Sequence, residues 1–320
     1  MNGQKSDKKR HNMSQFAIWI ALLAMLIFFS VTTKGFLTST NIFNVLRQVA
    51  VNGIAAVGAT MVIITGGIDI SQGAVMGVAS VGCAMMINQG IHPALAVLLS
   101  LILGLVIGIC NGFFVFEINL PPMIATLGVS TVLRGVAYII SGGLPVYGLP
   151  ESFTVIGQGY LGPIPVPVII MIVCFIFGYF LLEHTAFGRY IYGVGSNREA
   201  SRLSGVNIRK IYYGVYALCS FLAALAGIVL LSRVNSGQPK AGENYDMDII
   251  TAVVLGGVST TGGEGKIVNV IVGLLLIGVV LNGMVLMNIS DYYQRVVKGA
   301  VLLLAISYDK LSQMKSQKTA

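Results

Sequence analysis

The sequence predicts an all-α, polytopic membrane protein with about ten transmembrane helices, some short or discontinuous, and with both termini in the cytoplasm. Its 320 residues are 55% hydrophobic and only 10% charged, whereas soluble domains are about 25% charged. Apolar runs recur along the chain, and a span of about 30 Å of hydrocarbon takes about 20 helical residues. Because these runs lack the polar alternation of barrel strands, helices are the expected form.

Ten apolar segments are expected to form a single transmembrane domain over residues 16–310, between a basic tail at 1–15 and a short tail at 311–320. The first segment is longer than the apolar part of a signal peptide, so we expect an uncleaved span. Segments 73–88 and 246–258 are short, and either could be a re-entrant or discontinuous helix. The ten segments are 16–33, 42–65, 73–88, 93–114, 122–141, 165–183, 211–232, 246–258, 267–287 and 292–308.

The positions of Lys and Arg predict the orientation, because the cytoplasmic flanks of spans retain basic residues. With the amino terminus inside and ten crossings, most of the 20 basic residues fall inside, and the long outer connection 141–164 carries none. An odd number of crossings would place one basic tail outside. The exceptions are Lys34, Arg233 and Lys240 in outer connections and Arg47, Arg134, Arg295 and Lys298 within spans.

Several functional classes are excluded by motifs and charge placement. The net charge of +8 lies at segment ends rather than beside stacking aromatic residues, which argues against nucleic acid. The stretch 256–266 fails the phosphate-loop pattern, because Thr260 stands in place of its first glycine and Ile267 in place of its hydroxyl. The four cysteines lie in apolar runs without CxxC spacing. We therefore expect no catalytic residue, no metal site and no cofactor bound by this chain.

Two glycine-rich stretches, 66–73 and 256–266, are expected to be sharp turns or unwound backbone near the cytoplasmic face. Each places glycines and polar residues between two apolar runs. Within the first, Asp69 is expected to hold an adjacent backbone turn or a basic partner rather than to contact a substrate. The expected turn residues are Gly66, Gly67, Asp69, Gly256, Gly257, Gly262 and Gly263.

The stretch 187–210 gathers five basic residues against one acid. Ser196 followed by Glu199 fits the capping box that begins a helix, and Gly205 stands where a helix would stop. We therefore expect a helix over 197–204, with Glu199 and Arg202 paired on one side. Since so short a helix is marginal in water, it needs a surface to lie against. Two interpretations stay open: a solvated loop that only fixes topology, or a docking helix for a cytoplasmic partner.

Five longer motifs are spread along the chain: ITGGIDISQG (64–73), PPMIATLG (121–128), TAFGRYIYGVGSNREASRLSGV (185–206), AGENYDMDIITAVVLGGVSTTGGEG (241–265) and LNGMVLMNISDYYQRVVKGAVLLLAI (281–306). Together they closely resemble the ribose-type sugar permeases of bacterial ATP-binding-cassette importers. The resemblance implies a multi-pass permease of the bacterial inner membrane that pairs with a second permease copy as a homodimer. It also implies a separate cytoplasmic ATPase, which binds ATP and magnesium, and an extracytoplasmic sugar-binding protein.

In that family the segment matching 185–210 is the cytoplasmic coupling loop, so the resemblance favours the docking interpretation. Ser196 and Ser201 depart from the commoner residues, which leaves open the identity of the partner rather than the role. The expected ATPase-docking residues are Gly195, Ser196, Asn197, Arg198, Glu199, Ala200, Ser201, Arg202, Leu203, Ser204 and Gly205.

A sugar is neutral and rich in hydroxyls, so its route needs hydrogen-bonding side chains. Asn111, Thr126 and Asn282 interrupt apolar helices and are candidates for the substrate pathway, but hydrogen bonds between helices explain them equally well. The expected substrate is ribose or a related monosaccharide. A stand-alone ion-coupled carrier of a small polar solute is the main alternative and a pore a third. Such a carrier needs an ion site at membrane depth, and Asp and Glu are absent from the spans 16–33, 93–114, 165–182, 211–232 and 267–287.

Overall fold

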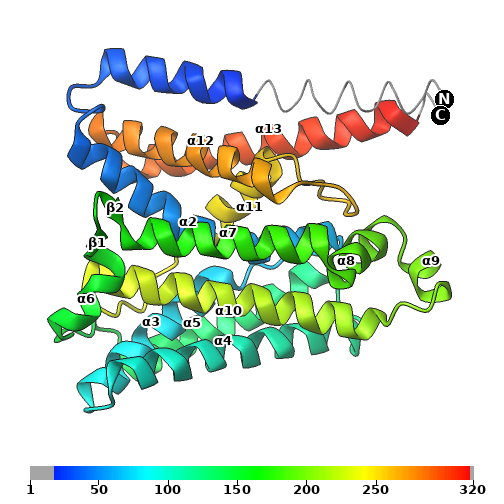
Figure 1. Ribbon diagram of the computed structural model, residues 1–320, viewed down its shortest axis with the longest axis horizontal. Helices are drawn as coiled ribbons and strands as arrows, with labels where there is room; N and C mark the ends of the chain where they lie inside the picture. Colours follow the sequence, from blue (N-terminus) through cyan, green and yellow to red (C-terminus); the bar gives the residue numbers. More distant parts are fainter. Residues whose placement is uncertain (1–17, 318–320) are drawn as a thin grey trace.

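Helices make up nearly all of the regular structure in residues 18–317, which the computed structural model describes. Most run along one direction (Figure 1). The predicted tail 1–15 lies outside the described residues. After a first helix at Ile18–Thr32, the helices are α2 (Ser39–Ile64), α3 (Gln72–Asn88), α4 (Pro93–Phe116), α5 (Pro122–Ser141), α6 (Glu151–Gln158), α7 (Val166–His184), α8 (Ala186–Ser196), α9 (Arg198–Leu203), α10 (Ile208–Val234), α11 (Tyr245–Leu255), α12 (Ile267–Leu286) and α13 (Asp291–Gln317).

Each of the ten predicted segments overlaps one of these helices, so the all-α prediction is confirmed. Six helices, α2, α4, α5, α7, α10 and α12, are long and apolar enough to cross a membrane by length and composition. The number of crossings and the orientation of the termini stay predictions. α11 has 11 residues, which at 1.5 Å per residue is about 16 Å, roughly half the hydrocarbon thickness.

The connection 141–164 is more structured than the sequence predicts. It contains the helix α6 and a small antiparallel pair, β1 (Tyr160–Leu161) and β2 (Ile164–Pro165). The amide of Gly157 donates to Ser232 Oγ at 2.7 Å, and that hydroxyl donates to Phe153 O at 2.7 Å. α6 is therefore fixed to the last turns of α10, at the end of the bundle opposite α9 (Figure 1).

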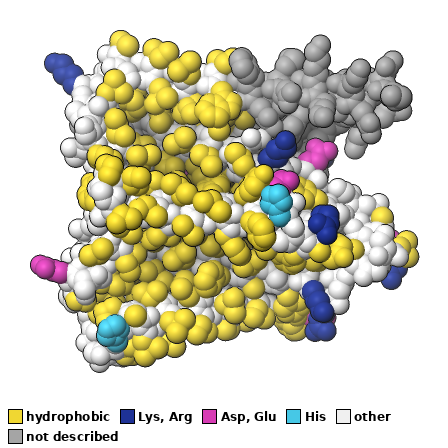
Figure 2. All heavy atoms as spheres, viewed as in Figure 1, with side chains coloured by type: hydrophobic (Ala, Val, Ile, Leu, Met, Phe, Trp, Pro, Cys, Tyr) yellow, Lys and Arg dark blue, Asp and Glu magenta, His cyan; other side chains and the backbone are white. Residues whose placement is uncertain are grey.

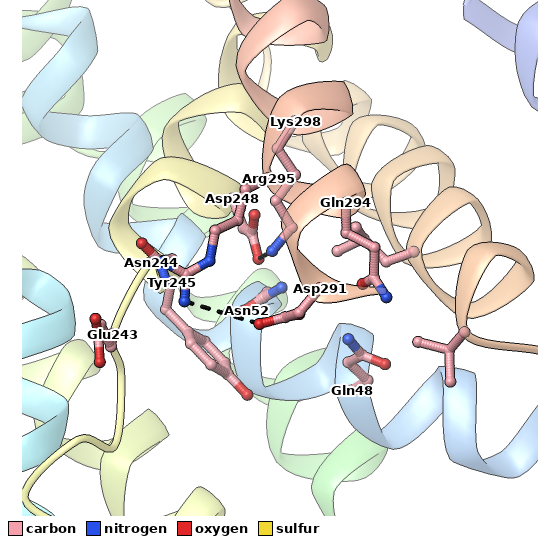
Figure 3. Close-up of a pocket in the computed structure, with 12 residues that line it drawn as sticks. Gln48, Asn52, Glu243, Asn244, Tyr245, Asp248, Asp291, Gln294, Arg295 and Lys298 are labelled. Carbon is pink, nitrogen blue, oxygen red and sulfur yellow. Dashed lines mark hydrogen bonds and ion pairs between the residues drawn. The ribbon is translucent and has the colours of Figure 1, made fainter. Parts of the chain in front are cut away.

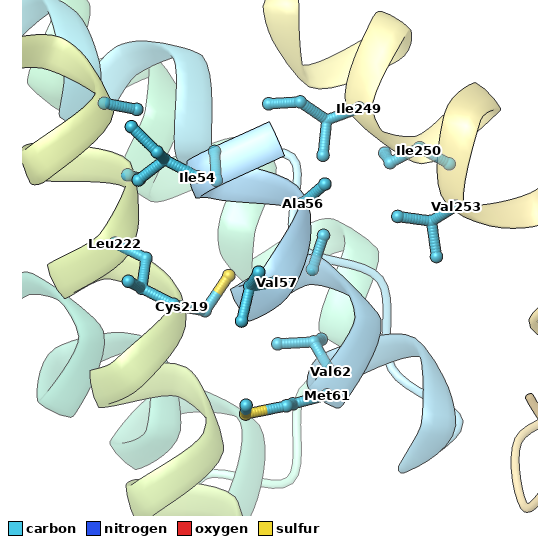
Figure 4. Packing of buried hydrophobic residues seen from close by; sticks show 14 of the residues in the cluster. Ile54, Ala56, Val57, Met61, Val62, Cys219, Leu222, Ile249, Ile250 and Val253 are labelled. Carbon is cyan, nitrogen blue, oxygen red and sulfur yellow. The ribbon is translucent and has the colours of Figure 1, made fainter. Parts of the chain in front are cut away.

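The core is built around α2, whose residues 49–64 are all buried. Figure 4 shows Val57 and Met61 of α2 between the side chains of α10, such as Leu222, and those of α11, such as Val253. Gly108 of α4 lets two helices come into backbone contact, because a Cβ there would overlap the carbonyl oxygen of Tyr216 in α10. Such close approach is how helices pack where lipid supplies no hydrophobic drive.

The peripheral helices expose apolar side chains. In the most apolar window of α2, 89% of the residues are buried, against 28% in α4 and in α5. Figure 2 shows hydrophobic side chains covering the broad middle of one face, with charged side chains mainly toward the helix ends. This distribution is that of a multi-pass membrane protein, whose outer surface faces lipid.

Candidate functional site: the α8–α9 unit

The predicted docking segment forms two helices that meet at Asn197. α8 begins where Thr185 Oγ1 accepts a hydrogen bond from the amide of Gly188 at 3.1 Å. The backbone then turns out of the helix at Asn197, with φ −158° and ψ 103°, and α9 follows. α9 protrudes at one end of the bundle (Figure 1). Of the predicted docking residues, Ser201 is buried, Gly195 is half-buried and the others are exposed.

The predicted capping box at Ser196 is wrong. Ser196 is the last residue of α8, and the N-cap of α9 is Asn197, whose Oδ1 accepts from the amide of Ala200 at 2.9 Å. Ser and Asn are comparable N-cap residues, and the backbone decides between them, because only Asn197 leaves the helical region. Gly205 follows the C-cap with φ +82°, so α9 ends where the sequence predicts.

The predicted pair on α9 is present and lies in solvent. Arg202 contacts Glu199 with two hydrogen bonds, Nη2 to Oε1 at 2.6 Å and Nε to Oε2 at 3.0 Å. These bonds hold the pKa of the Glu199 carboxyl below its ordinary value. Exposed ion pairs contribute little to stability, so the pair shapes the outer face of α9. Beside it, the Leu203 side chain is 74% exposed.

The start of α9 is attached to α4 and α10 through aromatic rings. The Arg198 guanidinium lies 5.6 Å from the ring centre of Phe116 in α4 and 5.2 Å from that of Tyr212 in α10, within the range of cation–π attraction. Nearby, Arg209 pairs with Glu117 and so joins the same two helices. The sequence analysis did not identify these contacts. The sequence signal that could have identified them is an aromatic residue near one end of each of these two helices, Phe116 in α4 and Tyr212 in α10.

The structure brings the end of α2 and the second glycine-rich stretch, 256–266, against the end of α8. The amide of Gly263 donates to Ile64 O at 2.8 Å, and Tyr192 Oη donates to Gly265 O at 2.8 Å. A Cβ at Gly195 would overlap the Ile64 carbonyl oxygen. Four predicted turn glycines have positive φ: Gly66 (+82°), Gly257 (+81°), Gly262 (+87°) and Gly263 (+78°). The predicted docking segment, the end of α2 and the loop before α12 therefore meet through backbone contacts.

Two predicted substrate-pathway residues meet at the buried break between α2 and α3. Asp69 Oδ1 accepts from the amide of Ser71 at 2.8 Å and from its hydroxyl at 2.6 Å, which holds the turn. Asn111 donates to Ser71 Oγ at 2.9 Å, and Thr126 Oγ1 accepts from the amide of Ile70 at 3.1 Å. These bonds tie α4 and α5 to the break.

Asn282 lies apart from that cluster, in a pair with Asn41 of α2. Their side-chain amides exchange two hydrogen bonds of 2.9 Å each, and both residues are buried. Hydrogen bonds to other segments thus engage all three candidates, and their role in the pathway stays a prediction.

We expect Asn282→Leu to lower the free energy of unfolding by about 1–3 kcal/mol, since it leaves the buried Oδ1 of Asn41 without its donor. The double variant Asn41→Leu/Asn282→Leu should regain most of that loss. Thermal unfolding of the purified proteins measures both. Equal losses in the single and double variants would contradict the paired geometry.

Comparisons with known proteins agree with the predicted family. The family described as "branched-chain amino acid transport system / permease component" matches residues 41–306. The ribose import permease protein RbsC of Bacillus subtilis is 43% identical over 300 residues, which cover 93% of each chain. RbsC of Escherichia coli K12 is 41% identical over 98% of each chain. The xylose transport system permease protein XylH of Haemophilus influenzae is 31% identical over 96% of this chain and 99% of its own. No solved structure matches the chain.

Proposed function

We propose, on the premise that the chain belongs to the family of the branched-chain amino acid transport system permease component, that it is the membrane subunit of a bacterial importer for a monosaccharide. The names of its relatives support ribose or a related sugar as the substrate. The observation that carries the proposal is α9, a short capped helix held out from one end of the bundle with Leu203 exposed. In this proposal α9 docks on a separate ATPase of the ATP-binding-cassette type.

The proposed assembly is supported by the matching family and by the ribose permeases among the relatives. ATP and magnesium bind to the partner ATPase, and this subunit binds no cofactor and is not itself an enzyme. A sugar-binding protein outside the inner membrane delivers the sugar, and a second copy of the chain completes the passage. ATP binding draws the two docking helices together and shifts the pair between inward and outward access. The ATPase must therefore bind the two states with different affinity.

The contacts of α9 suit it to docking. Its start is held against α4 and α10 by Arg198, and Asn197 caps it, whereas its exposed side presents Leu203 and the Glu199–Arg202 pair to the outside. A helix of six residues does not persist alone in water, so its stability comes from these contacts. An exposed leucine on a fixed helix is a ready anchor for a partner's apolar groove.

Leu203→Asp should weaken binding of the ATPase by about ten- to a hundredfold. Burial of a leucine contributes about 1.5–3 kcal/mol, and each 1.4 kcal/mol is a factor of ten. Titration of the purified ATPase onto the permease in nanodiscs measures this affinity. Leu144→Asp is the matched control, because Leu144 is 70% exposed in the connection after α5, at the other end of the bundle. Unchanged affinity in Leu203→Asp, or equal loss in both variants, would reject the docking assignment.

Uptake experiments with the purified permease distinguish the proposed importer subunit from a stand-alone carrier. We expect vesicles that contain this chain alone to accumulate no sugar under any ion gradient, and accumulation to require the ATPase, ATP and the binding protein. Uptake by the chain alone that collapses with the gradient would favour the carrier.

A further inference from the structure

A polar cavity of about 290 Å³ lies between α2, α11, α12 and α13. Twelve residues line it, and those that matter most to its chemistry are Asn52, Glu243, Tyr245, Asp248, Asp291 and Lys298. Five of these twelve residues are charged and four carry amides, in a chain of which 10% is charged. Figure 3 shows that side chains from α2, the start of α11 and the start of α13 converge on this space.

The cavity lies at the start of a half-length helix. α11 begins at Tyr245 and is about 16 Å long, and the loop that follows it reaches the end of α8 through Tyr192 and Gly265. If that loop lies at the membrane surface, Tyr245 and Asp248 lie near mid-depth, since the hydrocarbon is about 30 Å thick. The first amides of a helix have no partner within the helix, and Asn244 provides no side-chain cap for α11. At the start of α11, however, the amides of Tyr245 and Asp248 donate to Gly242 O at 3.1 Å and to Asn244 O at 3.3 Å, so donors for a ligand must come from side chains.

Two buried acceptors in the cavity lining have no hydrogen-bond partner among residues 18–317. These are Asn52 Oδ1 and Asp248 Oδ1, on side chains of residues only 5% and 6% exposed. An unpartnered buried acceptor costs about 1–3 kcal/mol, so both atoms favour a ligand that donates hydrogen bonds. Lys298 Nζ donates to Asp248 Oδ2 at 2.8 Å and has two further hydrogens to give.

The charges of the cavity are largely matched within it, which favours a neutral ligand over an ion. Lys298 pairs with Asp248, and Arg295 lies 3.8 Å from Asp291, so only Glu243 has no opposite charge among the lining residues. In the described part of the chain, His, Cys, Asp and Glu form no group of three that could hold a metal ion. The volume is at the small end of the roughly 300–1,000 Å³ range of ligand sites, which suits one sugar ring.

We infer that this cavity is a monosaccharide-binding subsite within the subunit, in which Asn52 and Asp248 accept hydrogen bonds from sugar hydroxyls. In this subsite Lys298 donates to a sugar oxygen, and the ring of Tyr245 supplies an apolar face for the carbon side of the sugar. The inference rests on the proposed function, because it takes a sugar as the substrate class. The predicted pathway residues Asn111 and Thr126 lie elsewhere, at the break between α2 and α3, and they stay separate candidates.

The test uses the full-length permease in nanodiscs, without its ATPase, and D-ribose as the probe in saturation-transfer NMR. We expect the wild-type chain to give a ribose signal and Asn52→Leu to bind ribose about tenfold more weakly. Gln89→Leu is the matched control, because it removes an amide from the exposed C-cap of α3, and its signal should equal that of the wild type. If Asn52→Leu is not monodisperse after purification, Gln48→Leu takes its place, since Gln48 is only half-buried.

Equal ribose signals from wild type and variant, or no signal from the wild type, would overturn the subsite. Because sugar binding is measured without the ATPase, a failure of docking would appear separately, as a wild-type chain that does not bind the ATPase. Ribose uptake by the complete complex tests the proposed function itself, so uptake together with equal ribose binding by the wild type and Asn52→Leu rejects the subsite alone.

Discussion

A single methyl group at Gly195 should uncouple ATP hydrolysis from sugar uptake. A Cβ there would overlap the Ile64 carbonyl oxygen at the end of α2 and would lie 2.5 Å from the amide nitrogen of Gly263. Both are backbone atoms, and they are hydrogen-bonded to each other at 2.8 Å, so neither can turn away as a side chain does. Gly195→Ala must therefore push the end of α8, and with it α9, off the end of α2.

Overpacking costs about 1–3 kcal/mol, and a factor of ten is 1.4 kcal/mol, so we expect Gly195→Ala to lower sugar-stimulated ATP hydrolysis by about ten- to a hundredfold. The reconstituted complex of permease, ATPase and binding protein measures it. Gly193→Ala is the control on the same helix, because its Cβ would meet only the Ser201 hydroxyl, at 3.3 Å. Full activity in Gly195→Ala would show that sugar-stimulated ATP hydrolysis does not depend on the close contact between α8 and the end of α2.

This contact connects the predicted docking segment to the buried core of the helix bundle. Gly195 lies three residues before the start of α9, and Ile64 is the last residue of α2, just before the break that Asp69 and Ser71 hold. A displacement of α9 therefore reaches, within a few residues, the buried break to which Asn111 is hydrogen-bonded. Because these contacts join backbone atoms in a close-packed interior, rotation of a side chain cannot absorb such a displacement.

The sequence was sufficient for the elements with strong local signals. Long apolar runs predicted the helices, and the charge and turn residues of 187–210 predicted a short helix that ends before Gly205. Its cap was assigned one residue too early, because Ser196 and Asn197 are both good caps and only their backbone angles separate them. α6, β1 and β2 were missed, since elements of eight and two residues have no periodicity to detect and are formed by contacts such as Gly157 with Ser232.

The cavity could not have been predicted as a site, because its residues come from three distant segments. Lys298 was noted only as a basic residue within a span, and its partner Asp248 lies 50 positions earlier. Neither segment contains a sequence pattern that predicts its pairing with the other. The local signal was the presence of each charge inside an apolar run, which predicts that it has a partner or a function without saying which residue provides it.

Removing one member of that pair should be strongly destabilising. The side chains of Asp248 and Lys298 are 7% and 23% exposed and join α11 to α13. Lys298→Met leaves the Asp248 carboxylate buried without its cation, which typically costs about 3–5 kcal/mol. We therefore expect a large fall in the melting temperature of the purified protein. Asp248→Leu/Lys298→Met should recover most of it, because replacing both charges with apolar groups removes the unpaired charge.

Arg295→Met provides the comparison one turn away on α13. Arg295 also faces a carboxylate, that of Asp291, but the two side chains are 54% and 76% exposed and 3.8 Å apart. A pair this exposed contributes about 0–1 kcal/mol, so the same substitution should barely shift the melting temperature. Similar shifts in Lys298→Met and Arg295→Met would mean that Asp248 is reached by water or by another cation. In that case the argument that paired charges in the cavity favour a neutral sugar would fail. This measurement therefore tests the electrostatic basis of the subsite without any ligand.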